Sequence, residues 1–370
     1  MKQIDLEPTL TPASQSAAEP GQEMTVQEAE VSVLRRVLRP QTIVSFLFSF
    51  AILVFFLTRI NIDVNEVLAR MSTANPGLLL LAFVAYYLSF PVRALRWRML
   101  LGNAGLSKAD NWRVPGVPGL TEMIFVSWFA NCIVPAKLGD AYRSYMLKSR
   151  ARVSFSTTIG TILTERITDV LVLFGLLVAA GFIAFRGHLP DQLLYLLIFG
   201  GVLVGIVVVG LLSMRGLRPL AARLLPARLH DLYTKFEHGI LRSFQVRTLP
   251  ALLAYTGLVW VLEGLRLYFV SAALGIRLPL SVTLFIALAS SLLTTIPFTP
   301  AGLGFVESAV VTALLWFRID LATSLSISFL DRIISYWSII VFGLIVYILG
   351  ANRERLRGLA RRAVAARTED

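Results

Sequence analysis

Cysteine, histidine and charge are all scarce in this sequence of 370 residues, which contains one cysteine, three histidines and 16% charged residues. A single cysteine, Cys132, cannot form a disulfide within the chain, and no cysteine or histidine pair has the spacing of metal ligands. We therefore expect no metal site and no cofactor. The histidines His188, His230 and His238 fall in predicted connections, where we expect no catalytic role.

Sequence signatures of common enzymes are missing as well. The chain has no Walker A loop, no HExxH, no GxSxG and no dinucleotide-binding fingerprint. An intramembrane transferase needs a nucleophile and a base, and no such pair stands out, although acids within the membrane could serve. We therefore expect a protein that is not an enzyme.

The low charge also excludes an ordinary soluble domain, in which about a quarter of the residues are charged. Hydrophobic residues make up 56% of the chain, and the mean hydropathy is +0.71. Because a helix of roughly 20 apolar residues spans a bilayer and the alternation typical of strands is absent, we predict an all-α polytopic membrane protein. Its six full spans are predicted at 41–59, 77–97, 155–185, 190–213, 250–275 and 321–349.

Two further apolar stretches, at 119–148 and 279–318, are interrupted near their middles by the similar phrases PAKLGD and PAGLGF. Proline removes a backbone donor and disfavours helix continuation, while glycine permits unusual dihedrals. We predict a broken, re-entrant helix pair in each stretch, since irregular backbone within a membrane must be buried in protein or face water. The alternative is that these prolines only end ordinary short helices at loops. The break residues are Pro135, Gly139, Pro297, Pro300, Gly302 and Gly304.

Three features recur in the two halves of the chain at matching offsets. They are a proline of the break, an arginine 31 or 32 residues after it, and an arginine nine residues before a glycine. In the first half these residues are Pro135, Arg166 and Arg93, and in the second half they are Pro300, Arg332 and Arg266. Such recurrence indicates an internal repeat, with a coincidence of common dipeptides as the alternative.

Lysine and arginine gather in alternate connections, a bias that orients a multi-pass protein. The basic connections are 35–39, 96–113, 148–152, 214–248 and the end beyond residue 351. Both termini are therefore assigned to the cytoplasm. Three predicted spans then separate Arg93 from Arg266, and this odd number makes the repeat an inverted one. Its copies cover about 77–185 and 250–349, with 190–213 as the linker span.

The two ends of the chain are polar. Residues 1–40 are predicted to contain a disordered tail and then an interfacial helix, and residues 351–370 a basic cytoplasmic tail. The transmembrane domain is predicted to cover residues 41–350 between them. The net charge is +12, but the basic residues lie beside apolar spans, where they set topology and meet anionic lipids. Nucleic acid is therefore not an expected partner.

Ionised side chains inside the predicted spans carry the functional prediction. A charge at the centre of a spanning helix costs about 2.5 to 3.5 kcal/mol on insertion scales, so charges that survive there usually pair, face water or function. We expect them to line a polar cavity in which arginine binds a phosphate and the acids bind a cationic group or a proton. Static ion pairs that tie helices together are the alternative. The predicted headgroup residues are Arg93, Asp140, Arg143, Glu165, Arg166, Asp169, Arg266, Glu307, Asp331 and Arg332.

A basic and aromatic cluster closes the span at 77–97. It comprises Arg93, Arg96, Trp97 and Arg98. Such a cluster is typical of an interfacial anchor whose arginines extend toward the surface, and capture of a headgroup is its other use.

Several of these stretches together resemble the flippase-like transmembrane family, which includes the membrane half of bacterial lysylphosphatidylglycerol synthases, the multiple peptide resistance factors. The stretches are RALRWRMLL at 93–101, VPAKLGDAYRSYMLK at 134–148, TERITD at 164–169, IPFTPAGLGFVESAVV at 296–311 and DRIISYWSIIVFG at 331–343. The second motif reads PAGLG where PGGLG is the more usual family form. The resemblance implies a flippase-like transporter that moves a phospholipid or aminoacyl-phospholipid between leaflets of the bacterial inner membrane.

The resemblance also implies partners. Membrane lipids with anionic or aminoacylated headgroups are expected, and the chain ends at Asp370 without a transferase domain, which weakens the inference of a lysyl-lipid. The alternative function is a non-transporting module that presents a lipid to a partner synthase or glycosyltransferase. A homodimer is left open.

Overall fold

The computed structural model describes residues 64–106, 114–133, 138–187, 191–224, 226–293 and 302–350. Within these ranges every regular element is a helix, so the predicted all-α class is confirmed there. The helices are α3 (Val64–Ser72), α4 (Pro76–Asn103), α5 (Val117–Ile133), α6 (Gly139–Ala151), α7 (Phe155–Ala184), α8 (Asp191–Leu224), α9 (Ala227–Ser243), α10 (Leu249–Ala273), α11 (Leu280–Leu293), α12 (Phe305–Trp316), α13 (Leu321–Arg332) and the π-helix η2 (Ile333–Trp337). An α-helix follows η2 over residues 338–350.

Five helical segments in the described residues are long and apolar enough to cross a membrane. They are Pro76–Asn103, Phe155–Ala184, Leu197–Met214, Leu249–Ala273 and Leu321–Gly350. Five of the predicted spans are thus present, and the chain is a multi-pass membrane protein. The predictions for 1–40, 41–59, 351–370, Pro135, Pro297 and Pro300 fall outside the described residues.

Each of the two interrupted apolar stretches folds as two short helices, as predicted. Helices α5 and α6 have 17 and 13 residues, and α11 and α12 have 14 and 12. At about 1.5 Å per residue each of them is shorter than the roughly 30 Å of hydrocarbon in a bilayer. None of these four helices can cross a bilayer of that thickness alone without thinning it locally.

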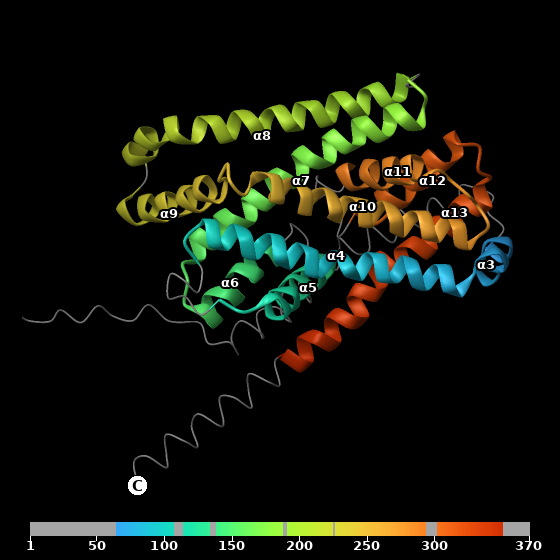
Figure 1. The fold of residues 1–370 in the computed structure, drawn as a ribbon, viewed down its shortest axis with the longest axis horizontal. Helices are drawn as coiled ribbons and strands as arrows, with labels where there is room; N and C mark the ends of the chain where they lie inside the picture. The colour runs from blue at the N-terminus through green and yellow to red at the C-terminus, as the bar shows by residue number, and fades with distance from the viewer. Residues whose placement is uncertain are drawn as a thin grey trace, which may run out of the picture.

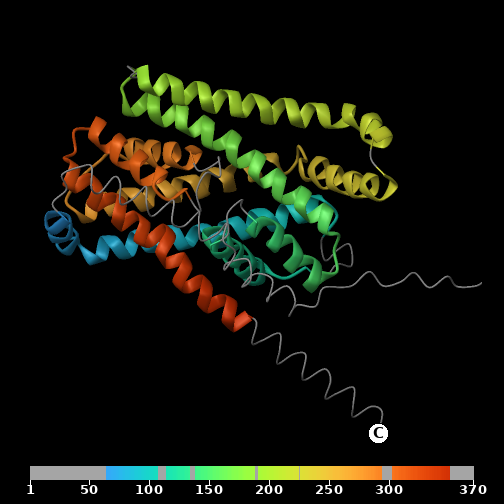
Figure 2. The same cartoon turned by 180° about the vertical axis from the view of Figure 1, so that it is seen from behind.

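The first helices of the two predicted repeat copies, α4 and α10, pack side by side through the middle of the molecule (Figure 1). Helix α8 lies along one edge, where it contacts α7 and α9 and exposes apolar side chains such as Tyr195 and Leu212. Seen from behind, the helix 338–350 leaves the body at the edge opposite α8 (Figure 2). Exposed apolar faces on both edges are typical of a surface that meets lipid.

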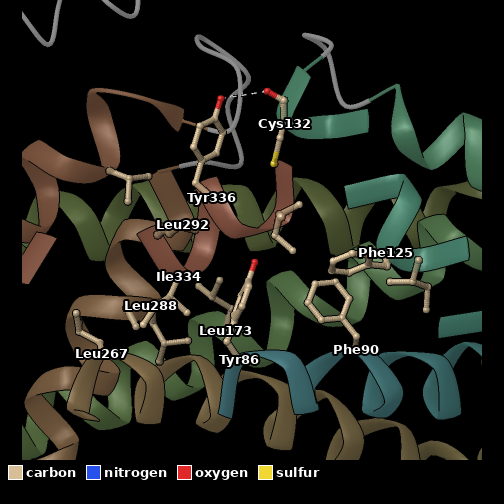
Figure 3. Close-up of a cluster of buried hydrophobic side chains, with 14 of the residues drawn as sticks. Tyr86, Phe90, Phe125, Cys132, Leu173, Leu267, Leu288, Leu292, Ile334 and Tyr336 are labelled. Carbon is tan, nitrogen blue, oxygen red and sulfur yellow. Dashed lines mark hydrogen bonds between the residues drawn. The ribbon is translucent and has the colours of Figure 1, made fainter. Parts of the chain in front are cut away.

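The core joins both halves of the chain. Tyr86 and Phe90 of α4 are nearly or fully buried and meet Phe125 of α5 and Ile334 of η2 in one cluster (Figure 3). The rings of Phe90 and Phe125 meet edge to face with centroids 5.0 Å apart. Aromatic pairs of this geometry add roughly 0.5 to 1.5 kcal/mol beyond the area they bury.

The π-helix η2 interrupts the last span directly after Arg332. The Tyr86 hydroxyl donates to the Ser335 carbonyl within it at 2.9 Å. The Tyr336 hydroxyl donates to the Cys132 carbonyl at the end of α5 at 3.3 Å, the dashed contact in Figure 3. Short π-helical segments inside α-helices are rare and frequent at functional sites, and this one is held to both α4 and α5.

The connection before α13 is fixed by a capping aspartate. Asp320 accepts from the Thr323 backbone N–H at 3.0 Å, and Arg70 of α3 lies 3.5 Å from the same carboxylate. Partial burial alone would raise the pKa of the Asp320 carboxyl, but the hydrogen bonds from Thr323 and the charge of Arg70 hold that pKa below its ordinary value. The contact ties α3 to the start of the last span.

Candidate functional site

Arg96 of α4 is the most deeply buried charge of the candidate site. Its side chain is fully shielded, and its guanidinium donates to Glu165 at 2.8 Å and to Asp169 at 2.5 Å. A third hydrogen bond reaches the Thr256 hydroxyl of α10 at 3.0 Å. Because an unpaired ion in this position would be very costly, the two acids of α7 fix how α4 packs on α7 and α10.

Glu165 is shared by two arginines. Its second carboxylate oxygen accepts from Arg143 of α6 at 3.0 Å, and the Arg143 guanidinium lies 4.5 Å above the Trp97 ring. The ring face offers a cation a favourable contact where water is absent. Glu165 therefore joins α6 to α4 through Arg96.

Arg166 and Asp140 form the more open part of the same cluster. The Nε and terminal N–H groups of Arg166 donate to the two Asp140 oxygens at 3.0 and 2.9 Å. The side chains are 31% and 18% exposed, whereas Arg96 is at 0%. This paired fork is the geometry with which arginine also binds phosphate.

The N-terminus of α6, which carries Asp140, sits tightly against α5. The Gly139 N–H donates to the Asn131 side chain at 2.8 Å. A Cβ on Gly139 would lie only 2.0 Å from the Ser127 carbonyl oxygen. Only glycine therefore allows α6 to begin where Asp140 meets Arg166.

The second half carries its own buried pairs. Arg266 of α10 donates to the two oxygens of Asp331 at 2.7 and 3.1 Å and also contacts Glu263 on its own helix. Glu263 in turn accepts from Arg93 of α4 at 3.1 Å. Glu263 therefore links the first helices of the two halves.

Arg332 pairs with Glu307 at 2.8 Å, next to the second interrupted stretch. Glu307 also accepts from the Gly304 backbone N–H at 2.7 Å and so caps α12. Gly302 and Gly304 have φ angles of 71° and 85°, which L side chains rarely adopt. The two glycines thus allow the turn before α12, and the capping hydrogen bond to Gly304 holds the Glu307 carboxylate beside Arg332.

The two halves share one pattern of ion pairs. In each half an arginine of the first helix (α4 or α10) binds an acid of the last (α7 or α13), and an arginine of that last helix binds an acid in the first turn after the interruption. The pairs are Arg96–Asp169 and Arg166–Asp140 in the first half, and Arg266–Asp331 and Arg332–Glu307 in the second. We call these residues, with Arg93, Arg143, Glu165 and Glu263, the charge network.

The charge network contains every predicted headgroup residue. It adds two that the sequence analysis did not assign to the site, Arg96 and Glu263. Spacing could have found both, because Arg96 is three residues after Arg93 and Glu263 three before Arg266, on one helix face each. The prediction of a surface anchor is wrong for Arg93 and Arg96, which are 2% and 0% exposed. Only Arg98 of that cluster is an exposed arginine, because one helix face turns inward and the next turns out.

The charge network is electrically balanced, with six arginines against six carboxylates. Each of these charges has a counter-ion, so most of the network ties helices together, as the static alternative expects. Among the residues that the structure describes, no three of His, Cys, Asp and Glu gather so as to hold a metal ion. Arg166–Asp140 is the most exposed pair of the network, with side chains at 31% and 18%.

Comparison with known proteins agrees with the resemblance seen in the sequence. The family model described as the lysylphosphatidylglycerol synthase TM region matches residues 42–343. A UPF0104 membrane protein of Methanocaldococcus jannaschii is 36% identical over 222 residues, which is 59% of this chain and 93% of that protein. A UPF0104 membrane protein of Pyrococcus horikoshii is 24% identical over 299 residues, 74% of this chain and 87% of that protein.

A further relative corrects one expectation. Glycosyltransferase AglD of Haloferax volcanii is 27% identical over 319 residues, which is 76% of this chain and 50% of that protein. The expectation of a protein that is not an enzyme is therefore contradicted, since a relative of this chain is named as a glycosyltransferase. These relatives are archaeal, so the bacterial inner membrane stays a prediction.

Proposed function

Because this chain belongs to the lysylphosphatidylglycerol synthase transmembrane-region family, we propose that it moves an amphiphilic lipid between the two leaflets of its membrane. The cargo is a phospholipid or an aminoacyl-phospholipid. The membrane is the cytoplasmic membrane, with both termini on the cytoplasmic side.

The matching ion pairs of the two halves carry this proposal. If residues 77–185 and 250–349 are inverted copies, Arg166–Asp140 and Arg332–Glu307 are equivalent headgroup-binding sites that are reached from opposite leaflets. Both pairs stand beside an interrupted stretch, and both are more exposed than Arg96, with side chains at 31% and 18% and at 11% and 12%. Alternating access requires two such related binding sites, one on each side of a buried centre such as Arg96.

Exchange of partners explains how a balanced network binds a headgroup. A phosphate accepts the paired fork of Arg166 in place of the Asp140 carboxylate, because the two anions present similar oxygen geometry. The released Asp140 then needs a cation, which an ammonium on the headgroup supplies. A headgroup with both phosphate and amine leaves no buried charge unpaired, so it is favoured over a simple anion.

A second candidate function is supported by the relative named as a glycosyltransferase. In it the chain holds a lipid and presents it to a partner synthase or glycosyltransferase without moving it across the bilayer. The same charge network would bind the headgroup, but access from one leaflet would suffice.

Reconstitution separates the two functions. The purified chain is placed in liposomes that contain fluorescent lipids with anionic, zwitterionic or aminoacylated headgroups, and an impermeant quencher reports the fraction in the outer leaflet. The transport proposal expects rapid loss of protected fluorescence for an amine-bearing phospholipid and no such loss in protein-free liposomes. If every headgroup stays in its original leaflet while the protein still binds one of them, the presenting function replaces transport.

A further inference from the structure

An apolar groove of about 550 Å³ opens between α4, α5 and the helix 338–350, apart from the charge network. It is lined by Phe83, Tyr87, Phe90, Thr121, Glu122, Phe125, Phe342, Val346, Leu349 and Gly350. Its volume falls within the roughly 300 to 1,000 Å³ of ligand pockets. Two lining residues of the last helix, Phe342 and Leu349, are 42% and 54% exposed, so the groove opens sideways onto the face that meets lipid.

Aromatic rings form most of the groove wall. Phe83 stacks on Tyr87 with centroids 4.2 Å apart, and Phe342 meets both rings edge-on at 5.9 and 6.0 Å. The Tyr87 hydroxyl, the polar atom of this wall, is engaged with Ser338 at 2.8 Å. Because the Tyr87 hydroxyl is already hydrogen-bonded, the wall presents rigid apolar ring faces, which suit a hydrocarbon chain.

One end of the groove is polar. Glu122 pairs there with Arg150 at 2.9 Å, and both side chains remain partly exposed, at 28% and 27%. Gly350 closes the same end, since a Cβ on it would lie 3.5 Å from the Glu122 carboxylate. Lys148 and Arg152 are close to Arg150 in sequence at the end of α6, so this helix end is basic, as is typical of a segment that meets anionic lipid.

One wall of the groove reaches toward the charge network. Phe90 and Phe125 line the groove, and Phe90 also meets the Trp128 ring edge-on at 5.7 Å. The Trp128 ring in turn lies 4.6 Å from the Arg93 guanidinium. A continuous aromatic path therefore joins the groove to the buried charges.

We propose that this groove binds one hydrocarbon chain of a phosphate-bearing lipid, with the phosphate at Arg150. The inference rests on the proposed function, because it assigns the groove as the place where the cargo is loaded from one leaflet. Selectivity comes from the polar end, since lipid tails and an apolar wall attract each other no more than tails attract tails. A phosphate takes the place of Glu122 on Arg150, as at Arg166.

Photo-crosslinking in liposomes tests the groove without any transport measurement. The full chain is mixed with phosphatidic acid or with diacylglycerol that carries the same diazirine-labelled acyl chain, and labelled peptides are mapped by mass spectrometry. Phosphatidic acid should label segments 83–90, 121–125 and 342–349 more strongly than it labels the exposed face of α8. Diacylglycerol should label these three segments less than phosphatidic acid does. Equal labelling of the groove and of α8 would overturn the proposal.

Matched variants locate the occupant. Val346→Trp fills the groove and should abolish its labelling, whereas Leu344→Trp on the exposed face of the same helix, at 46% exposure, should leave it unchanged. Arg150→Gln should lower phosphatidic acid labelling about fivefold, the effect of one basic residue near an anionic surface, and leave diacylglycerol labelling as it was. Unchanged labelling in Val346→Trp or Arg150→Gln would refute the assignment.

The outcomes separate this inference from the proposed function. If groove labelling responds to these variants but no lipid moves for any headgroup, the groove assignment is supported and the transport proposal is refuted. If lipids move but the groove is not labelled preferentially, the transport proposal is supported and the groove assignment is refuted.

Discussion

Arg96 shows at the scale of one residue how burial and charge set the stability of this protein. Its guanidinium is fully shielded and serves Glu165 and Asp169 at once. Removal of one partner from a buried pair is far more damaging than removal of both, because an uncompensated charge remains. The same rule separates the fully buried pairs that hold the helices from the more exposed Arg166–Asp140 pair, for which we propose an exchange of partners.

Arg96→Gln is expected to lower the free energy of unfolding by about 3 to 5 kcal/mol, because it removes the fully buried cation that pairs with both Glu165 and Asp169 and leaves excess buried negative charge. Thermal unfolding of the detergent-solubilised protein measures the loss. Arg98→Gln on the same helix is the control, since the exposed Arg98 side chain should matter by no more than about 0.5 kcal/mol. Equal midpoints for the two variants would contradict the buried role of Arg96.

Arg166→Gln is expected to behave differently. Its pair with Asp140 is partly exposed, so stability should fall by about 1 kcal/mol or less, while lipid movement should fall more than about tenfold, the equivalent of 1.4 kcal/mol in transition-state stabilisation. The leaflet assay and a thermal melt are read on the same preparation. Arg277→Gln, in an exposed connection, is the control, and a rate for Arg166→Gln equal to that of this control would remove Arg166 from the site.

The residue scale also shows what could be predicted. The cost of charge in a membrane was enough to single out Arg166, Asp140 and Arg332 from the sequence. It was not enough to place Arg96, because basic residues near a span end follow the same pattern whether their helix face turns to the surface or to a neighbouring helix. That choice depends on α7 and α10, which are distant in sequence.

At the scale of elements, hydropathy predicted the spans because each is a long apolar run. The sequence placed the start of the third span at 155 and of the last at 321, and α7 and α13 begin at those residues. Hydropathy did not predict η2, because a π-helix differs from its neighbours by a shift of hydrogen-bond partners and not by composition. It also ended one span at 213, whereas α8 continues to Leu224.

Gly139→Ala tests how the interrupted stretch holds Asp140. The added Cβ would lie 2.0 Å from the Ser127 carbonyl oxygen, so α6 must move away from α5 and carry Asp140 from Arg166. We expect lowered thermal stability and loss of lipid movement. Gly175→Ala in α7 has nothing within 4 Å of its Cβ and should stabilise by about 0.5 to 1 kcal/mol. Wild-type behaviour in Gly139→Ala would show that α6 is not constrained as described.

At the scale of the whole molecule, matching offsets along the chain predict a repeat, and the ion pairs of the two halves share a pattern in which Arg96, not the predicted Arg93, corresponds to Arg266. Offsets along the chain could not show that Glu263 reaches Arg93 across the α4–α10 contact, because that distance depends on how two helices cross. They also could not distinguish a cavity from a closed network, since both need the same residue types.

Cysteine labelling tests the orientation on which the inverted repeat depends. In a Cys132→Ala background, Val246→Cys and Arg277→Cys place single thiols at the exposed ends that flank α10. An impermeant thiol reagent should reach position 246 only from the cytoplasmic side and position 277 only from the other. Labelling of both from one side would contradict the assigned topology.

The most direct test of the account removes the charge of the exchangeable pair while keeping its shape. The double variant Asp140→Asn with Arg166→Gln leaves no unpaired ion of this pair, so its thermal midpoint should stay close to that of the wild type. If the pair binds the headgroup, this stable variant should move an amine-bearing phospholipid no faster than protein-free liposomes do. Movement at the wild-type rate would show that Arg166 and Asp140 only tie helices together.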